Sequence, residues 1–160
     1  IEEVGKDVCR YFFMMRRSDA QLVFDLDLAK KRSDENPVYY IQYAHARICS
    51  ILRNASELGH VPDVSRLEED ALTTGDDLDL IKMIAGYPDL VVSCAADLEP
   101  HRISFYLLEL ATAFHRFYNR NRVISDDSRL TMARLILVVA VKQVLANALG
   151  LMGISAPESM

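Results

Sequence analysis

The sequence of 160 residues has no tryptophan, few cysteines and no long hydrophobic run. Its longest apolar segment, residues 135–141, is bounded on both sides by a basic residue and is far shorter than the ~20 residues that a membrane-spanning helix needs. The cysteines, Cys9, Cys49 and Cys94, are isolated, so no C-x-x-C pair indicates a zinc or redox site. No signal-peptide pattern opens the chain. We therefore expect a cytoplasmic protein with reduced thiols and no membrane partner.

The sequence also lacks the common signatures of a catalytic site. None of its histidines stands in a His-x-x-His pair, and no glycine-rich phosphate loop precedes a helix. Asp25 and Asp27 could suggest paired catalytic carboxylates. Their position, where an extended segment at residues 22–25 meets a helix, and the absence of a further partner favour helix capping and salt bridges instead. No metal site is predicted.

The formal net charge of −5 argues against a nucleic-acid-binding protein, but the charges are unevenly distributed along the chain. Residues 61–100 carry two basic and ten acidic side chains, whereas residues 101–160 carry seven basic and four acidic ones. Arg116, Arg120 and Arg122 follow one another closely and flank Phe117 and Tyr118. A basic and aromatic patch on an acidic protein favours a local, salt-dependent contact with phosphates, with the acidic segment as a solvated face.

Caps and hydrophobic spacing predict helices through most of the chain. We expect helices over about residues 6–17, 27–33, 37–58, 78–85, 100–119 and from just after Asp127 to about 149. Gly86-Tyr87-Pro88 is expected to break the helix that ends at 85 before a further helix that ends near 97. Residues 65–68 match a capping box. No segment shows a convincing β-alternation, so the predicted fold class is an all-α helical bundle.

The most informative helix begins with Asn36 as its N-cap and Pro37 as its first residue. Apolar residues at spacings of three and four predict its core face: Ile41, Ala44, Ile48, Ile51 and Ala55. Tyr40, Tyr43 and Arg47 follow the same spacing about 100° around the helix axis. Such a row suits stacking on bases, although from spacing alone the tyrosines could equally border the core with their hydroxyls in solvent.

Residues 36–47, Asn-Pro-Val-Tyr-Tyr-Ile-Gln-Tyr-Ala-His-Ala-Arg, closely resemble a helix in the C-terminal half of the arginyl-tRNA synthetases. Residues 4–7, 10–12 and 24–29 resemble the family's segment between catalytic and anticodon-binding domains, and residues 100–118 and 151–160 resemble its last helices and terminus. The resemblance implies a bundle of the class I synthetase anticodon-binding type. In it, residues 1–33 form the connecting segment and residues 34–160 the anticodon-binding domain. Ser159 departs from the family, which has a basic residue there.

The resemblance further implies recognition of the anticodon arm of arginine tRNA, in support of ATP-dependent attachment of arginine to that tRNA. It places aromatic residues and the terminal methionine around the anticodon loop: Tyr40, Tyr43, Tyr118 and Met160. From their positions in the sequence, we expect the arginines to hold the RNA backbone: Arg47, Arg116, Arg120 and Arg122. The His-x-Gly-His and Met-Ser-Lys signatures of class I catalysis are absent. We therefore expect a C-terminal fragment with no catalytic residue and no cofactor, ATP and Mg²⁺ in the parent enzyme, no DNA partner, and a monomer.

Met160 can act at the chain end only if the tail is docked. Leu151, Met152 and Ile154 supply apolar side chains to fold the tail back, and Pro157 stiffens it. Two alternatives to the assignment stay open. One is the helical domain of another class I synthetase, such as a cysteinyl enzyme. The other is a bundle for protein assembly, in which Tyr40 and Tyr43 face a partner protein.

Overall fold

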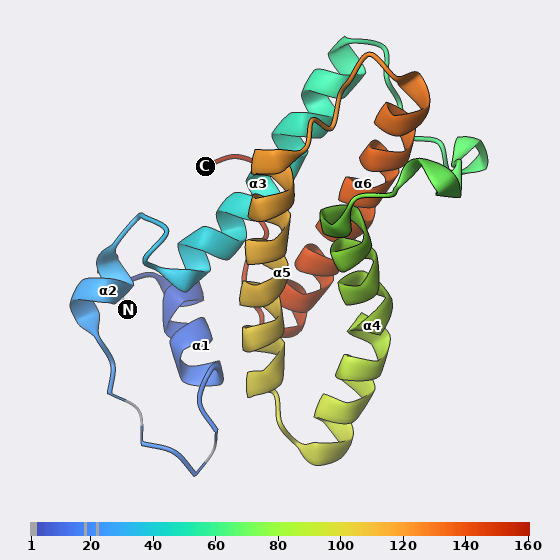
Figure 1. The fold of residues 1–160 in the computed structure, drawn as a ribbon. Coiled ribbons are helices and arrows are strands. Elements are labelled where there is room, and N and C mark those ends of the chain that lie inside the picture. The colour runs from blue at the N-terminus through green and yellow to red at the C-terminus, as the bar shows by residue number, and fades with distance from the viewer. Residues whose placement is uncertain (1–2, 18, 22) are drawn as a thin grey trace.

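The computed structural model describes residues 3–17, 19–21 and 23–160, and in these residues it contains only helices and loops (Figure 1). The elements are α1 (Lys6–Met14), α2 (Leu26–Lys30), α3 (Pro37–Glu57), the 3-10 helices η1 (Val64–Arg66) and η2 (Glu69–Ala71), α4 (Gly75–Asp97), α5 (His101–Arg120) and α6 (Ser128–Leu151). The predicted all-α bundle is confirmed. The extended segment expected at 22–25 includes Leu22, which lies outside the described residues.

The long helices pack around one apolar core (Figure 1). α5 and α6 contact each other, and each also contacts both α3 and α4, so these two helices form the centre of the bundle. α1 packs against α3 and α5, where Tyr11 and Phe12 are buried. The Tyr11 hydroxyl donates a hydrogen bond of 3.0 Å to the carbonyl of Ser104 on α5. The segment before α2 therefore contributes to the same core.

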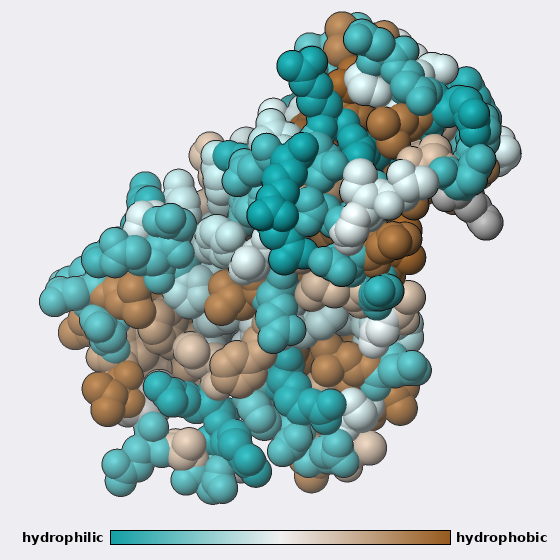
Figure 2. Space-filling view, viewed as in Figure 1, coloured by the Kyte–Doolittle hydropathy of each residue, from teal (hydrophilic) through white to brown (hydrophobic). Residues whose placement is uncertain are grey.

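α6 is long and apolar enough to cross a membrane by length and composition, but 56% of its most apolar 18-residue window is buried inside the protein. It is the core helix of a bundle. On the face of the molecule drawn in Figure 2, hydrophilic side chains predominate and hydrophobic ones form separate patches. The burial of α6 and this mixed surface are typical of a globular domain.

The predicted break at Pro88 is wrong, because α4 runs from Gly75 to Asp97 with Pro88 inside it. A proline cannot donate to the carbonyl four residues earlier, which weakens a helix at that point. The carbonyl left without its donor is that of Ile84, and contacts from α5 hold α4 in place on either side of it. Tyr87 stacks on Tyr106, with ring centroids 5.6 Å apart, and the Tyr106 hydroxyl donates to the Met83 carbonyl at 3.0 Å.

The capping box expected at residues 65–68 is also absent from the structure, because that segment forms the 3-10 helix η1, capped by Asp63. The capping box of the chain is at the start of α4. The Asp77 amide donates to the Thr74 hydroxyl at 3.2 Å, and the Thr74 amide donates to Asp77 Oδ2 at 3.0 Å. The caps expected at Asp25, Asn36 and Asp127 are confirmed.

The C-terminal tail after α6 folds back along α3, as predicted. Gly153 adopts the left-handed conformation (φ 65°) and ends α6 in a Schellman motif, in which the Ile154 amide donates to the Leu149 carbonyl at 2.9 Å. Met152 and Ile154 are buried, and the next residues cross to α3. The expectation for Leu151 is wrong, because it is the last residue of α6 and its side chain is exposed. Gln42 on α3 donates to the Ser155 carbonyl at 3.0 Å. The tail therefore places the chain end beside the tyrosine row of α3.

Candidate functional site

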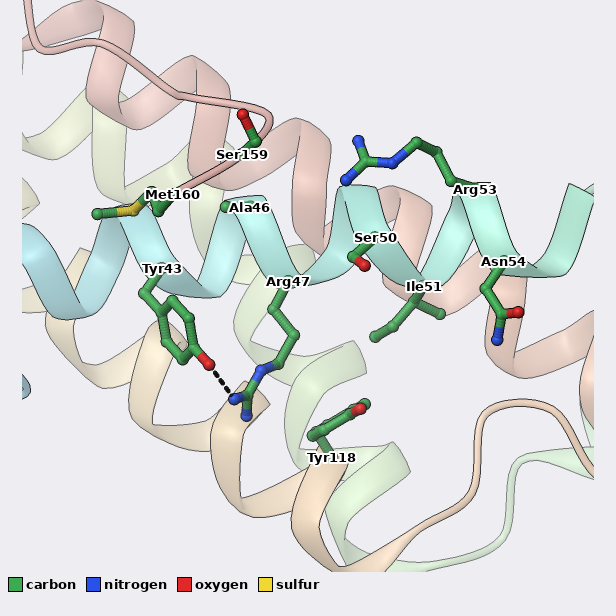
Figure 3. Close-up of a pocket in the computed structure, with 10 residues that line it drawn as sticks. All are labelled: Tyr43, Ala46, Arg47, Ser50, Ile51, Arg53, Asn54, Tyr118, Ser159 and Met160. Carbon is green, nitrogen blue, oxygen red and sulfur yellow. Dashed lines mark hydrogen bonds between the residues drawn. The ribbon is translucent and has the colours of Figure 1, made fainter.

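A groove of about 420 Å³ runs along the exposed side of α3 (Figure 3). α3 forms its floor, the C-terminal tail forms one wall, and Tyr118 of α5 lies on the opposite side. It is lined by Tyr43, Ala46, Arg47, Ser50, Ile51, Arg53, Asn54, Tyr118, Ser159 and Met160. Half of the eight residues predicted to bind RNA meet in this one groove: Tyr43, Arg47, Tyr118 and Met160.

Arg47 lies between two phenol rings. Its Cζ atom is 4.5 Å from the ring centroid of Tyr43 and 4.8 Å from that of Tyr118, and its Nη2 donates to the Tyr43 hydroxyl at 2.5 Å. Both cation–π contacts hold the guanidinium in place without cancelling its charge. No carboxylate pairs with Arg47 among the residues that the structure describes. The groove therefore presents a fixed positive charge flanked by two aromatic faces, a combination suited to an anionic, aromatic ligand.

Tyr40 does not line the groove. Its half-buried ring lies 4.5 Å from the ring of His115, a residue that the sequence did not single out. His115 is itself buried, and its ring also stacks on Tyr43 at 5.8 Å. Burial lowers the pKa of His115, the hydrogen bond with the Tyr40 carbonyl partly opposes this, and Arg47 lowers the pKa further. His115 thus packs against both Tyr40 and Tyr43 and supports them from the core side of α3.

This buried histidine predicts a pH-dependent stability. Because its pKa is lower in the folded protein than the ordinary value of about 6.5, the unfolded chain binds more protons in mild acid. The contribution of neutral His115 to the free energy of unfolding is therefore fully present above about pH 6.5, and it is lost as the pH decreases toward the folded-state pKa. We expect the Tm of the unmodified chain to fall more between pH ~7.5 and pH ~5.5 than that of His115→Phe, which keeps a ring. Equal losses would contradict this account.

The three arginines near the end of α5 lie outside the groove. Arg116 Nε donates to Asp76 Oδ1 at 2.9 Å, and its Nη2 donates to Asp79 Oδ2 at 2.6 Å. Arg120 is exposed, with Nη1 3.8 Å from Asp76 Oδ1, and the Arg122 side chain is also exposed. The cluster seen in the sequence is thus partly neutralised by α4, and a phosphate would compete with carboxylates for Arg116.

Side chains of α3 bind the backbone of the tail and so fix Met160 at the groove. His45 Nδ1 lies 2.8 Å from the Pro157 carbonyl oxygen, and Arg53 Nη1 donates to the Glu158 carbonyl at 3.3 Å. The role of His45 is therefore structural. Sequence reasoning missed Arg53. It also missed the groove residues Ser50 and Asn54, although they continue the spacing that begins at Tyr43 and Arg47.

The chemistry of the groove is that of binding. It contains hydroxyls, an amide, two guanidinium groups, two phenol rings and a thioether, but no acid–base pair. Among the residues that the structure describes, no group of three His, Cys, Asp or Glu side chains could hold a metal ion. Stacking surfaces combined with hydrogen-bonding groups and fixed cations match the requirements for splayed bases of a single-stranded nucleic acid.

Residues 41–160 match the model of the DALR anticodon binding domain family, and the chain belongs to this family. Two relatives are the arginine–tRNA ligases of Syntrophotalea carbinolica, 57% identical, and Geotalea daltonii, 56% identical; each match covers 100% of this chain and 29% of the relative. The solved arginyl-tRNA synthetase of Thermus thermophilus has a TM-score of 0.81 and 31% identity, over 99% of this chain and 27% of that one. The resemblance seen in the sequence is confirmed, and the chain spans under a third of these relatives.

Proposed function

We propose that this chain binds the anticodon arm of arginine tRNA and so supports the ATP-dependent attachment of arginine to that tRNA. The observation that carries the proposal is the position of Arg47 between Tyr43 and Tyr118, with Met160 at the same groove. Bases that leave the stack of the anticodon loop can lie against the phenol rings. Arg47 can then contact a phosphate or a base edge.

The same proposal covers the other residues expected to bind tRNA. Tyr40 acts indirectly, because it packs on His115, whose ring stacks on Tyr43. Arg120 and Arg122 remain exposed for phosphate contacts beyond the groove. Arg116 binds a tRNA phosphate only after that phosphate has replaced its present partners, Asp76 and Asp79.

The proposed parent enzyme is a cytoplasmic arginyl-tRNA synthetase, monomeric, which uses ATP and Mg²⁺ at a site that lies outside this chain. Residues 1–33 connect that part to the anticodon-binding domain, residues 34–160. The burial of α1 residues Tyr11 and Phe12 gives the connecting segment a firm anchor on the bundle.

The test is to replace the exposed rings. Tyr118→Ala and Tyr43→Ala should each weaken binding of an arginine tRNA anticodon-arm hairpin by ~1–3 kcal/mol, because each removes a surface for base stacking. Fluorescence anisotropy with a labelled hairpin measures this affinity. Phe105→Ala is the matched control, since Phe105 is an exposed aromatic residue of α5, the helix that carries Tyr118, and lies away from the groove. If all three variants bind as the unmodified chain does, the groove does not bind RNA and a protein-assembly role is favoured.

A further inference from the structure

A second groove of about 360 Å³ lies on the N-terminal side of the first one. Its wall includes three consecutive basic residues, Lys30, Lys31 and Arg32, at the end of α2 and in the loop that leads to α3. Tyr39 and Met160 also line it. The family resemblance assigned no role to these basic residues, and their composition is that of a polyanion contact.

The two grooves are adjacent. Met160 lines both of them, so the chain end is their shared wall. Tyr39 in the second groove stacks on Tyr43 in the first, with ring centroids 6.2 Å apart and planes at 11°. These two tyrosines are separated by one turn of α3, about 5–6 Å along its axis. A single strand that leaves the first groove past Tyr43 and Met160 therefore has the second groove directly in front of it.

The three basic residues of the second groove differ in how readily they can bind a phosphate, because two of them are in ion pairs. Lys31 Nζ is 2.5 Å from Glu35 Oε2, and Lys30 pairs with Glu3. Both pairs are solvent-exposed, so they are weak and a phosphate can replace the carboxylate. Arg32 is exposed and has no ion pair in the part of the chain that the structure describes. Arg32 is thus the cation most ready to bind a ligand, with Lys31 next to it.

We propose that the second groove binds the ribose–phosphate backbone of the RNA strand that leaves the first groove, through Arg32 and Lys31. This inference rests on the proposed function, because it needs RNA in the first groove. The contact is to phosphate, so it carries affinity and orientation without base preference. It makes the two grooves one continuous track in which bases stack at Tyr118 and Tyr43 and the backbone is held beyond Met160.

The experiment is a salt titration of hairpin binding with the 160-residue chain. Removing one cation that binds a phosphate should reduce the slope of log affinity against log salt concentration by about 0.7–0.9. The double variant Lys31→Gln, Arg32→Gln should therefore show a salt slope smaller by about 1.5. If the affinities converge at ~1 M salt, it should bind roughly 30-fold more weakly at ~0.1 M salt, equally for hairpins of different loop sequence. Arg66→Gln, Lys82→Gln is the control, since it changes the net charge equally at exposed positions outside both grooves.

One variant should act in the opposite direction. Glu35→Gln removes the carboxylate that pairs with Lys31 and should tighten hairpin binding several-fold, a gain that a purely structural role would not give. The proposal is overturned if the Lys31, Arg32 variant keeps the salt slope of the Arg66, Lys82 control. In that case, weakened binding by Tyr118→Ala would still leave the proposed function standing. If the unmodified chain binds no hairpin, both proposals fail.

Discussion

Replacing Arg134 with methionine should lower the free energy of unfolding by about 3–5 kcal/mol, the usual cost of removing one partner of a buried ion pair. Arg134 on α6 and Asp77 on α4 are 7% and 0% exposed, and Arg134 Nε lies 3.3 Å from Asp77 Oδ1. Neither of these two atoms has a hydrogen bond of its own. Without the guanidinium, the Asp77 carboxylate would remain buried with its charge uncompensated. Thermal unfolding should show a Tm lower by roughly 10 °C.

The same arginine also secures the end of α5. Its Nη1 donates to the Arg122 carbonyl at 2.8 Å, and its Nη2 donates to Asn121 Oδ1 at 3.0 Å. These hydrogen bonds close the loop that follows Tyr118. Loss of Arg134 should therefore loosen the helix end that carries one ring of the groove, and hairpin binding should weaken together with stability.

Arg129→Met is the matched control for Arg134→Met. Arg129 belongs to the same helix and pairs with Glu68 at 2.5 Å, but its side chain is 54% exposed. Exposed pairs contribute about 0.2–1 kcal/mol. Adding Asp77→Asn to Arg134→Met should restore part of the stability, because the amide oxygen still accepts from the start of α4 at Thr74 but carries no charge. Equal losses for the Arg134 and Arg129 variants, or no rescue by Asp77→Asn, would contradict a buried charge pair.

The helix boundaries that the sequence predicted correctly are those set by local chemistry. Asn36 and Pro37 begin α3, and Gly59, in the left-handed conformation, follows its end. The error at Pro88 has a different origin. The contacts that keep α4 continuous come from Tyr106 on another helix, beyond the reach of any local pattern. The ion pair between Arg134 and Asp77 likewise joins residues that no spacing relates.

In the candidate site, too, some residues could be predicted from the sequence and others could not. Tyr43 and Arg47 could be predicted because they share one helix face, and Tyr118 and Met160 because of the family resemblance. The ion pairs of Arg116 with α4 could not be predicted, since they depend on how α4 packs on α5. Arg53 could not be assigned either, because its hydrogen bond to the tail requires the tail's course across α3.

Gly153→Ala should detach the tail and remove Met160 from the groove. Gly153 has φ 65°, which costs other residues roughly 1–2 kcal/mol. A Cβ atom there would also lie 1.9 Å from Arg10 Nη1, the donor of a 2.6 Å hydrogen bond to the Gly153 carbonyl. We expect a loss of about 1–2 kcal/mol in unfolding free energy, since the exposed end of the Arg10 side chain can move away from the added methyl group. Hairpin binding should weaken as well, with helical circular dichroism unchanged, because the helices themselves are intact.

Gly150→Ala is the matched control for Gly153→Ala, because it adds the same methyl group to a nearby glycine that has ordinary helical geometry. Gly150 is exposed within α6, and no atom lies within 4 Å of the position that a Cβ would take there, so alanine should stabilise the helix by about 0.5–1 kcal/mol. The two substitutions, three residues apart in sequence, should therefore change stability with opposite sign. Hydrogen exchange of residues 154–160 should rise in Gly153→Ala alone. Raised exchange with unchanged hairpin binding would mean that Met160 does not contribute to the binding site, whereas unchanged exchange would mean that docking of the tail does not depend on Gly153.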